Sequence, residues 1–80
     1  MQILCQIDTT DYEGWRRAFD ADAPRRMEAG LTLLQIWRDA DARSRVLLLL
    51  EANDRPLAEE WLRREGGFGG PMTATFLEFA

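Results

Sequence analysis

Four short apolar runs along the chain predict β-strands. Each run contains β-branched or aromatic side chains and is bounded by turn-forming residues, which is typical of strands. The predicted strands are Gln2–Asp8, Leu31–Arg38, Arg45–Ala52 and residues 73–79. The four leucines at 47–50 also suit a helix, but the polar turn before them and the cap residues after them leave too little length for one. We therefore expect a strand there.

From Asp11 onward, apolar side chains recur every three or four residues, which predicts an amphipathic helix. The apolar stripe consists of Tyr12, Trp15, Phe19, Ala23 and Met27. Charged residues, Arg26 among them, fall on the opposite face. Because Pro24 lacks a backbone N–H, we expect a kink or two helical pieces that meet near Asp22. Gly30 follows the stripe and is a common residue just past a helix end.

A second, shorter helix is predicted ahead of a glycine-rich loop. Asp54 is the expected N-cap, and Pro56 lies in the first turn, where its missing N–H is tolerated. The inward stripe of this helix is Leu57, Trp61 and Leu62. The helix ends at Glu65, and the loop GGFGGP (residues 66–71) leads to the last strand.

The element order is therefore β-α-β-β-α-β, which predicts a ferredoxin-like α+β fold with a four-stranded antiparallel sheet. At 80 residues, the chain is expected to form a single domain over residues 1–80. Two helices can cover only one face of such a sheet, and the other face would normally be polar.

The strands are instead apolar on both faces, which predicts a homodimer. In the third strand, Leu47 and Leu49 alternate with other leucines and a valine. In the second strand, we expect Leu33 and Trp37 on one face and Leu34 and Ile36 on the other. A monomer would expose one of these faces as a large apolar patch. A second copy of the same sheet is the simplest cover, in a two-fold interface.

Composition excludes several classes of chemistry and partner. All ten basic residues are Arg, and the chain has no Lys and no His. Schiff-base chemistry, histidine-assisted nucleophiles, histidine-ligated metals and histidine-held haem are thus excluded, and no cofactor or metal is expected. The net charge of −4 argues against binding to nucleic acid or to an anionic membrane surface. The single cysteine, Cys5, fits a reducing, cytoplasmic compartment.

Three phrases carry a family resemblance over nearly the whole chain. They are DYEGWRRAFDADAPRRMEAG, IWRDADARSRVLLLLEAND and PLAEEWLRREGG. With the element order, they resemble small members of the dimeric α/β-barrel superfamily related to antibiotic-biosynthesis monooxygenases. The resemblance implies two sheets that face each other and a ligand cavity between sheet and helices in each protomer. It also implies a choice of chemistries: cofactor-independent oxygenation of aromatic polyketides, cyclisation, lactone isomerisation or haem degradation. The last relies on a helix histidine, which this chain lacks.

Polar residues on the apolar strands are the first candidate site. If the pairs Leu4/Gln6, Gln35/Trp37, Leu49/Glu51 and Phe76/Glu78 share a face, they form an apolar wall with a few polar groups, as in small-molecule pockets. A buried Glu51 would have a raised pKa and could act as a general acid or base. Alternatively, these residues lie solvated near strand ends or bond across the dimer, and Glu51 pairs with Arg45 or Arg38.

Three aromatic residues complete the predicted pocket. Trp61 lies roughly where related families place a functional Trp or His, or it is an anchor of the core. Tyr12 could bind an aromatic substrate through its phenol, or it is part of the helix stripe. Phe68 lies at the tip of the glycine-rich loop, which is either a lid or a simple connector.

Two functional hypotheses follow. The first is a homodimer that binds a small apolar or aromatic molecule between sheet and helices. If it is an enzyme, its chemistry is cofactor-free oxygenation, cyclisation or isomerisation, with Glu51 as acid or base, Gln6 and Gln35 orienting the substrate, and Trp37, Trp61 and Phe68 walling the pocket. The alternative is a non-enzymatic homodimeric structural or interaction module.

Overall fold

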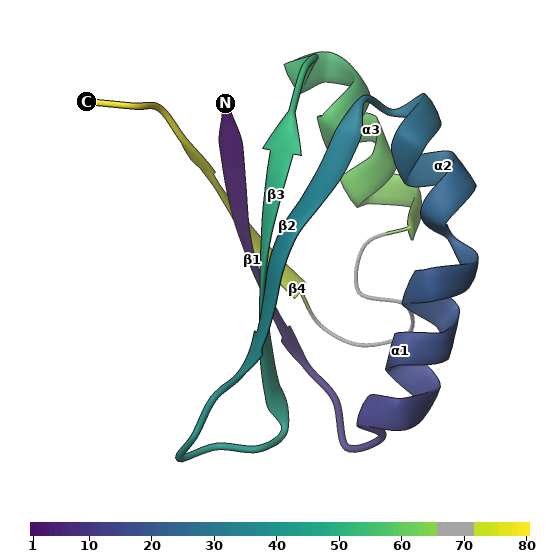
Figure 1. The fold of residues 1–80 in the computed structure, drawn as a ribbon, viewed down its shortest axis with the longest axis vertical. Helices are drawn as coiled ribbons and strands as arrows, with labels where there is room; N and C mark the ends of the chain where they lie inside the picture. Colours follow the sequence, from purple (N-terminus) through teal and green to yellow (C-terminus); the bar gives the residue numbers. More distant parts are fainter. Residues whose placement is uncertain (66–71) are drawn as a thin grey trace.

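The strands form one antiparallel sheet, and the helices lie together on one side of it in the computed structural model (Figure 1). The structure describes residues 1–65 and 72–80. The strands are β1 (Gln2–Asp8), β2 (Leu31–Arg38), β3 (Arg45–Ala52) and β4 (Met72–Leu77), and the helices are α1 (Tyr12–Ala21), α2 (Ala23–Glu28) and α3 (Arg55–Glu65). No helix within these residues is both long and apolar enough to cross a membrane.

The sheet has the strand order β2-β3-β1-β4, so β1 pairs with β3 on one side and with β4 on the other. This α+β arrangement is consistent with a ferredoxin-like fold. The predicted bounds of the first three strands are confirmed. The last strand spans Met72–Leu77 rather than residues 73–79, and its final residue, Leu77, pairs with Gln2, the first residue of β1.

The predicted break near Asp22 is confirmed and divides the first helical segment into α1 and α2. Asp22 is both the C-cap of α1 and the residue before α2, whose first turn contains Pro24. The predicted stripe is wrong beyond this point, since Met27 is 78% exposed and Arg26 is buried. The prediction of the stripe assumed one continuous helix. Because the helix breaks at Asp22, a different side of α2 faces inward.

The inward face of α3 also differs by one position from the prediction. Trp61 is fully buried as expected, but Leu57 is 45% exposed and its neighbour Ala58 is fully buried. Asp54 caps the helix as predicted, accepting a hydrogen bond of 3.1 Å from the amide of Leu57. The small side chain at Ala58 lets the helix lie close to the core.

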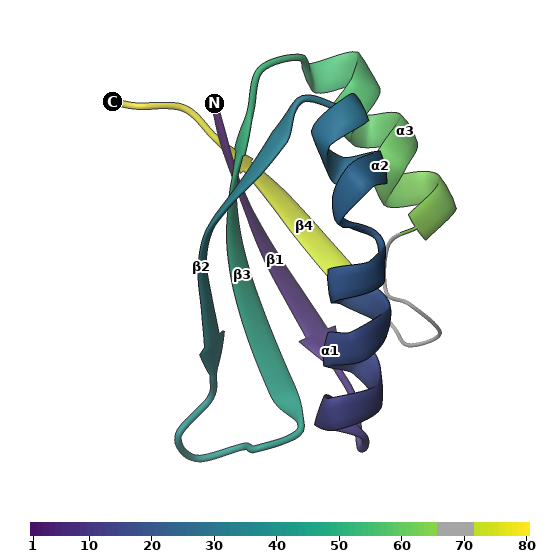
Figure 2. The ribbon, with the colours of Figure 1, turned by 45° about the vertical axis from the view of Figure 1, so that its right-hand side comes forward.

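One face of the sheet forms the core with the helices. Alternate residues of the two central strands point into it and are almost completely inaccessible: Ile3, Cys5, Ile7, Val46, Leu48 and Leu50. Trp15, Phe19 and Trp61 cover them from the helices. The other face, called the open face below, has no described helix over it (Figure 2). It includes an apolar group, Leu4, Trp37, Leu47, Leu49 and Leu77, and a polar group, Gln2, Gln6, Asp8, Thr32, Gln35, Arg45, Glu51, Thr73 and Thr75.

Two predicted strand faces need correction. A bulge between Leu33 and Gln35 shifts the register of β2. Leu33 and Ile36 therefore both pair with core-facing residues of β3, whereas Trp37 lies on the open face. In β4, Phe76 pairs with the core residue Ile3 and lies on the helix side, so it does not share a face with Leu49 or Trp37.

Candidate functional site

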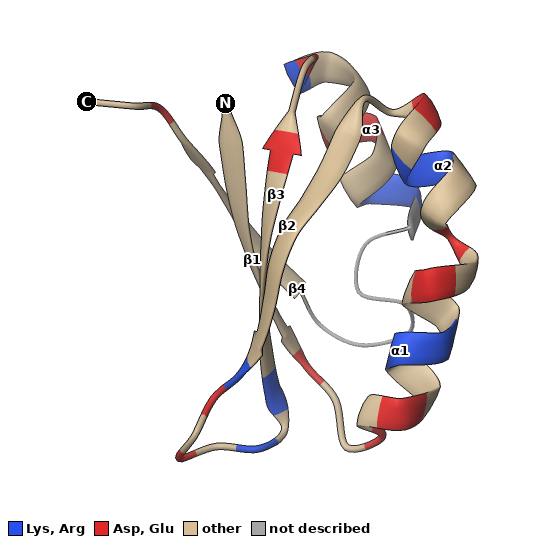
Figure 3. Cartoon of the chain, in the orientation of Figure 1, with Lys and Arg blue, Asp and Glu red and all other residues tan. Residues whose placement is uncertain are grey.

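The open face is an apolar surface between two polar ends. Leu4 pairs with Leu49, and Leu47 pairs with Trp37, so these side chains form a continuous strip over three strands. The leucines are half-buried, and Trp37 is 46% exposed. The charged residues lie towards the strand ends, with Glu51 at one end and the Asp8–Arg45 pair at the other (Figure 3).

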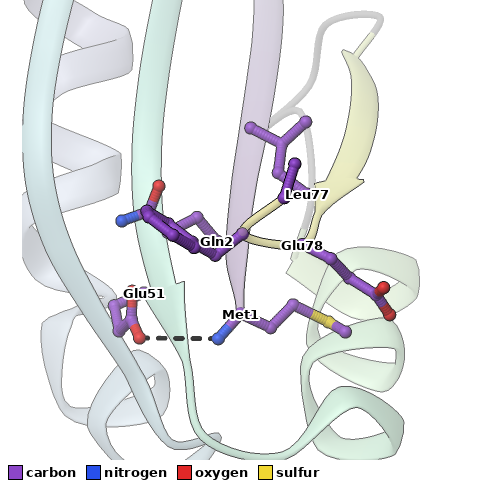
Figure 4. Close-up of a pocket in the computed structure, with 7 residues that line it drawn as sticks. Met1, Gln2, Glu51, Leu77 and Glu78 are labelled. Carbon is purple, nitrogen blue, oxygen red and sulfur yellow. Dashed lines mark hydrogen bonds and ion pairs between the residues drawn. The ribbon is translucent and has the colours of Figure 1, made fainter.

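A pocket of about 540 Å³ opens at the Glu51 end of this face. Its lining residues are Met1, Gln2, Glu51, Leu77, Glu78, Phe79 and Ala80. Figure 4 shows Glu51 and the amino group of Met1 on one side of the pocket, and Leu77 and Glu78 on the other. The carboxylate of Glu78 points away from Glu51, so the two acidic groups do not form a close pair.

Glu51 is partly exposed rather than buried, with 40% of its side chain accessible. Its Oε1 lies 3.5 Å from the amino group of Met1. The pairing with Arg45 or Arg38 that the sequence left open is not formed, because both arginines lie at the opposite end of the sheet. Arg45 instead lies 3.4 Å from Asp39. Glu51 is thus a partly exposed carboxylate in the pocket at one end of the open face.

The structure divides the predicted pocket residues between the two sides of the sheet. Gln6, Gln35 and Trp37 share the open face with Glu51. Tyr12 and Trp61 lie on the helix side, so one pocket within a single chain cannot contain both groups. Phe68 lies outside the described residues.

Tyr12 is held between two arginines. Arg16 donates a hydrogen bond of 3.3 Å to its hydroxyl, and this contact is the main cause of a raised pKa of Arg16. The guanidinium carbon of Arg38 lies 4.5 Å from the centre of the phenol ring. These contacts attach the start of α1 to the end of β2 and give the phenol a packing role.

A buried polar cluster joins Asp22, Arg26 and Trp61, and sequence reasoning missed it. The indole Nε1 of Trp61 donates a hydrogen bond of 2.7 Å to Oδ2 of Asp22. Nη1 of Arg26 lies 3.8 Å from the same oxygen and donates to the carbonyl of Phe19. Burial lowers the pKa of Arg26, opposed by the charge of Asp22. Asp22 and Arg26 are four residues apart, a spacing that favours an ion pair, but the assumption of one continuous helix placed Arg26 on the outer face.

This cluster ties the α1–α2 junction to α3 beneath the helices. The guanidinium of Arg26 lies 3.7 Å over the ring of Phe19, so its charge is accommodated by an aromatic face as well as by Asp22. Trp61 therefore anchors one helix to another through its N–H as well as through its ring. Oδ1 of Asp22 and Nε1 of Trp15 are buried and have no hydrogen-bond partner among the described residues.

Within residues 1–65 and 72–80, no three His, Cys, Asp or Glu side chains gather as metal ligands would. Comparisons with protein-family models, with curated proteins and with solved structures find no match to this chain. The geometry of the open face and its pocket is therefore the basis for assigning a function.

Proposed function

We propose that the protein is a cytoplasmic homodimer that pairs sheet to sheet through its open face and binds a small apolar or aromatic molecule at the Glu51 end of that face. This is the assembly of the dimeric α/β barrels that the sequence resembles. The observation that carries the proposal is an uncovered sheet face with a strip of leucines and a tryptophan, and a pocket at one end.

The apolar strip supports the dimer. Trp37 and Leu77 are 46% and 37% exposed in the single chain, beside half-buried Leu47 and Leu49. Large contiguous apolar surfaces of this kind mark interfaces in water-exposed proteins. A two-fold pair covers the same strip on both copies at once, because each copy presents the surface that the other needs.

The pocket supports the ligand. Its volume of about 540 Å³ lies within the usual range of small-molecule sites, roughly 300 to 1,000 Å³. Leu77 and Phe79 supply apolar lining, while Gln2 and Glu51 supply polar groups. A second sheet packed over this end would reduce the contact of Glu51 with water and bring its carboxylate beside a bound molecule. Proton-transfer cyclisation or isomerisation of an aromatic substrate suits such a group.

The second candidate is a homodimeric module without catalysis. The ion pair between Glu51 and the amino group of Met1 favours it, since a carboxylate engaged in this way has a structural use. The positions of Tyr12 and Trp61, each held by contacts within the helix layer, favour it as well. The two candidates share the dimer and differ in whether a molecule occupies the pocket.

A thermal-shift screen against aromatic and polyketide-like compounds separates the two candidates. A ligand that binds only the folded state raises the melting temperature. At a free concentration of 100 times its Kd, it adds about 2.7 kcal/mol to the free energy of unfolding. We expect at least one compound to raise the melting temperature of the wild type more than that of Glu51→Gln. Glu59→Gln, an exposed change on α3, is the control and should respond like the wild type. A screen without any stabilising compound contradicts the ligand site and leaves the non-enzymatic module.

A further inference from the structure

The apolar strip runs diagonally across the open face. It begins at Trp37 in β2, passes through the three leucines of the central strands and reaches Leu77 in β4. Trp37 lies in the row of Leu47, whereas Leu77 lies in the row of Glu51, four residues further along β3. The strip therefore extends about 14 Å across the strands and about 14 Å along them, so it lies at roughly 45° to the strands.

The four corners of the open face differ in polarity along its two diagonals. The edge strands of the described sheet, β2 and β4, each contribute one corner at each end. Thr32 shares a row with Leu77, and Thr73 shares a row with Trp37. Trp37 and Leu77 are thus the apolar corners, on one diagonal, and Thr32 and Thr73 are the polar corners, on the other. The apolar corners are 46% and 37% exposed, so both offer surface to a partner.

We propose that the second copy packs with its strands at nearly a right angle to those of the first, so that the two apolar strips lie on each other. This inference rests on the proposed homodimer. Packed sheets fall into two classes, with their strands either within about 30° of each other or crossed at about 90°. Viewed from one side, the strip of the facing copy leans the opposite way, because that copy is turned over. Two strips at roughly 45° therefore coincide only in the crossed class.

The polar side chains favour the same arrangement. When the strands cross, a two-fold axis along the strip or at a right angle to it places apolar corners on apolar corners and polar corners on polar corners. Gln6 and Gln35, which flank the strip on opposite sides, then face polar side chains rather than leucines. When the strands are aligned, each apolar corner faces a polar corner, and the strips overlap only at their middle. A second copy is thus an occupant whose pattern matches the open face over its whole area.

The crossed arrangement also completes the pocket. Leu77 lines the pocket together with Glu51. Because an apolar corner of the second copy lies over Leu77, the partner adds an apolar wall, which is its Trp37 or its Leu77 according to the axis. The site of each copy is therefore formed by both chains, and its outer wall suits an apolar part of the ligand.

Cysteines at the corners test the crossing. Thr32→Cys, Thr73→Cys and Trp37→Cys are made singly in Cys5→Ala chains, mixed, and treated with a bismaleimide. Facing corners lie about 10 Å apart and neighbouring corners about 17 Å apart, so a reagent that spans about 10 Å joins only facing corners. We expect links between the two threonine positions, or of each with itself, in at least about 10-fold higher yield than links from Trp37→Cys to either. Mass spectrometry of the linked peptides identifies each pair, and Glu59→Cys, exposed on α3, is the control that should not link.

The outcomes separate the crossing from the homodimer. Sedimentation equilibrium first shows whether the wild type and each variant dimerise, and Leu77→Cys reports on the apolar diagonal from its other end. A wild type that is monomeric at every accessible concentration overturns the homodimer and the crossing together. A dimer in which Trp37→Cys or Leu77→Cys links to a threonine position overturns the crossing alone, because the strands are then aligned. A dimer in which no corner links overturns the open face as the interface.

Discussion

At the scale of single residues, Asp22 is the buried charge on which the helix layer depends. Asp22→Ala removes the acceptor that Trp61 uses and the carboxylate beside Arg26. We expect the free energy of unfolding in urea to fall by about 3 kcal/mol, the usual loss for one partner of a buried pair. Asp20→Ala, an exposed change in the same helix, should cost less than about 0.5 kcal/mol. Equal losses in the two variants would contradict this role.

Cys5 gives a second residue-scale prediction, on pH. Burial raises the pKa of its thiol from an ordinary value of 9.0 to about 11. Above pH 9 the unfolded chain loses a proton that the folded chain keeps, so ionisation favours the unfolded state. Stability should therefore fall by about 1.4 kcal/mol per pH unit between those two values. In Cys5→Ala this part of the slope should be absent from denaturation curves measured at each pH. Parallel curves for the two proteins would contradict the buried thiol.

At the scale of elements, the sequence predicted boundaries better than faces. Turn and cap residues identified the ends of three strands, and Pro24 identified the break at Asp22, because both signals act on the local backbone. The bulge after Leu33 and the reset phase of α2 have no comparable local signature. In β2, a shift of one residue moves a side chain to the opposite face of the sheet. In α2, a shift of one residue turns a side chain by about 100° around the helix. For these reasons, Arg26 was wrongly placed outside, and Leu33 and Trp37 were wrongly placed on one face.

Gly30 supports the end of α2 through its backbone. Its φ of 72° lies in the left-handed region, and its carbonyl accepts a hydrogen bond of 3.0 Å from Asn53. An added Cβ would have room, with the nearest atom 3.5 Å away, so conformation alone sets the cost. We expect Gly30→Ala to lose about 1 to 2 kcal/mol of unfolding free energy in urea, and Gly30→Asn to lose less, since Asn adopts this region more readily. Gly30→Ala as stable as the wild type would contradict this prediction.

At the scale of the whole molecule, the residues of the predicted site are divided between the two faces of the sheet. Gln6, Gln35 and Trp37 join Glu51 on the open face, while Tyr12 and Trp61 belong to the helix layer. Periodicity groups the residues of one strand, but it does not say which group faces the helices. The pocket at Glu51 depends further on the path of the chain after Leu77, and no periodic signal describes that path.

The proposed dimer predicts that stability depends on protein concentration. When folding and association are linked, dilution favours the unfolded chain, so the urea midpoint should rise as the concentration of the wild type is raised. Leu49→Glu places a charge in the middle of the apolar strip and should abolish this dependence. Leu57→Glu, at an exposed position of α3, should leave it intact. Urea curves at micromolar and at hundredfold higher concentrations measure the effect. A wild-type midpoint that does not move between them would contradict a dimer linked to folding.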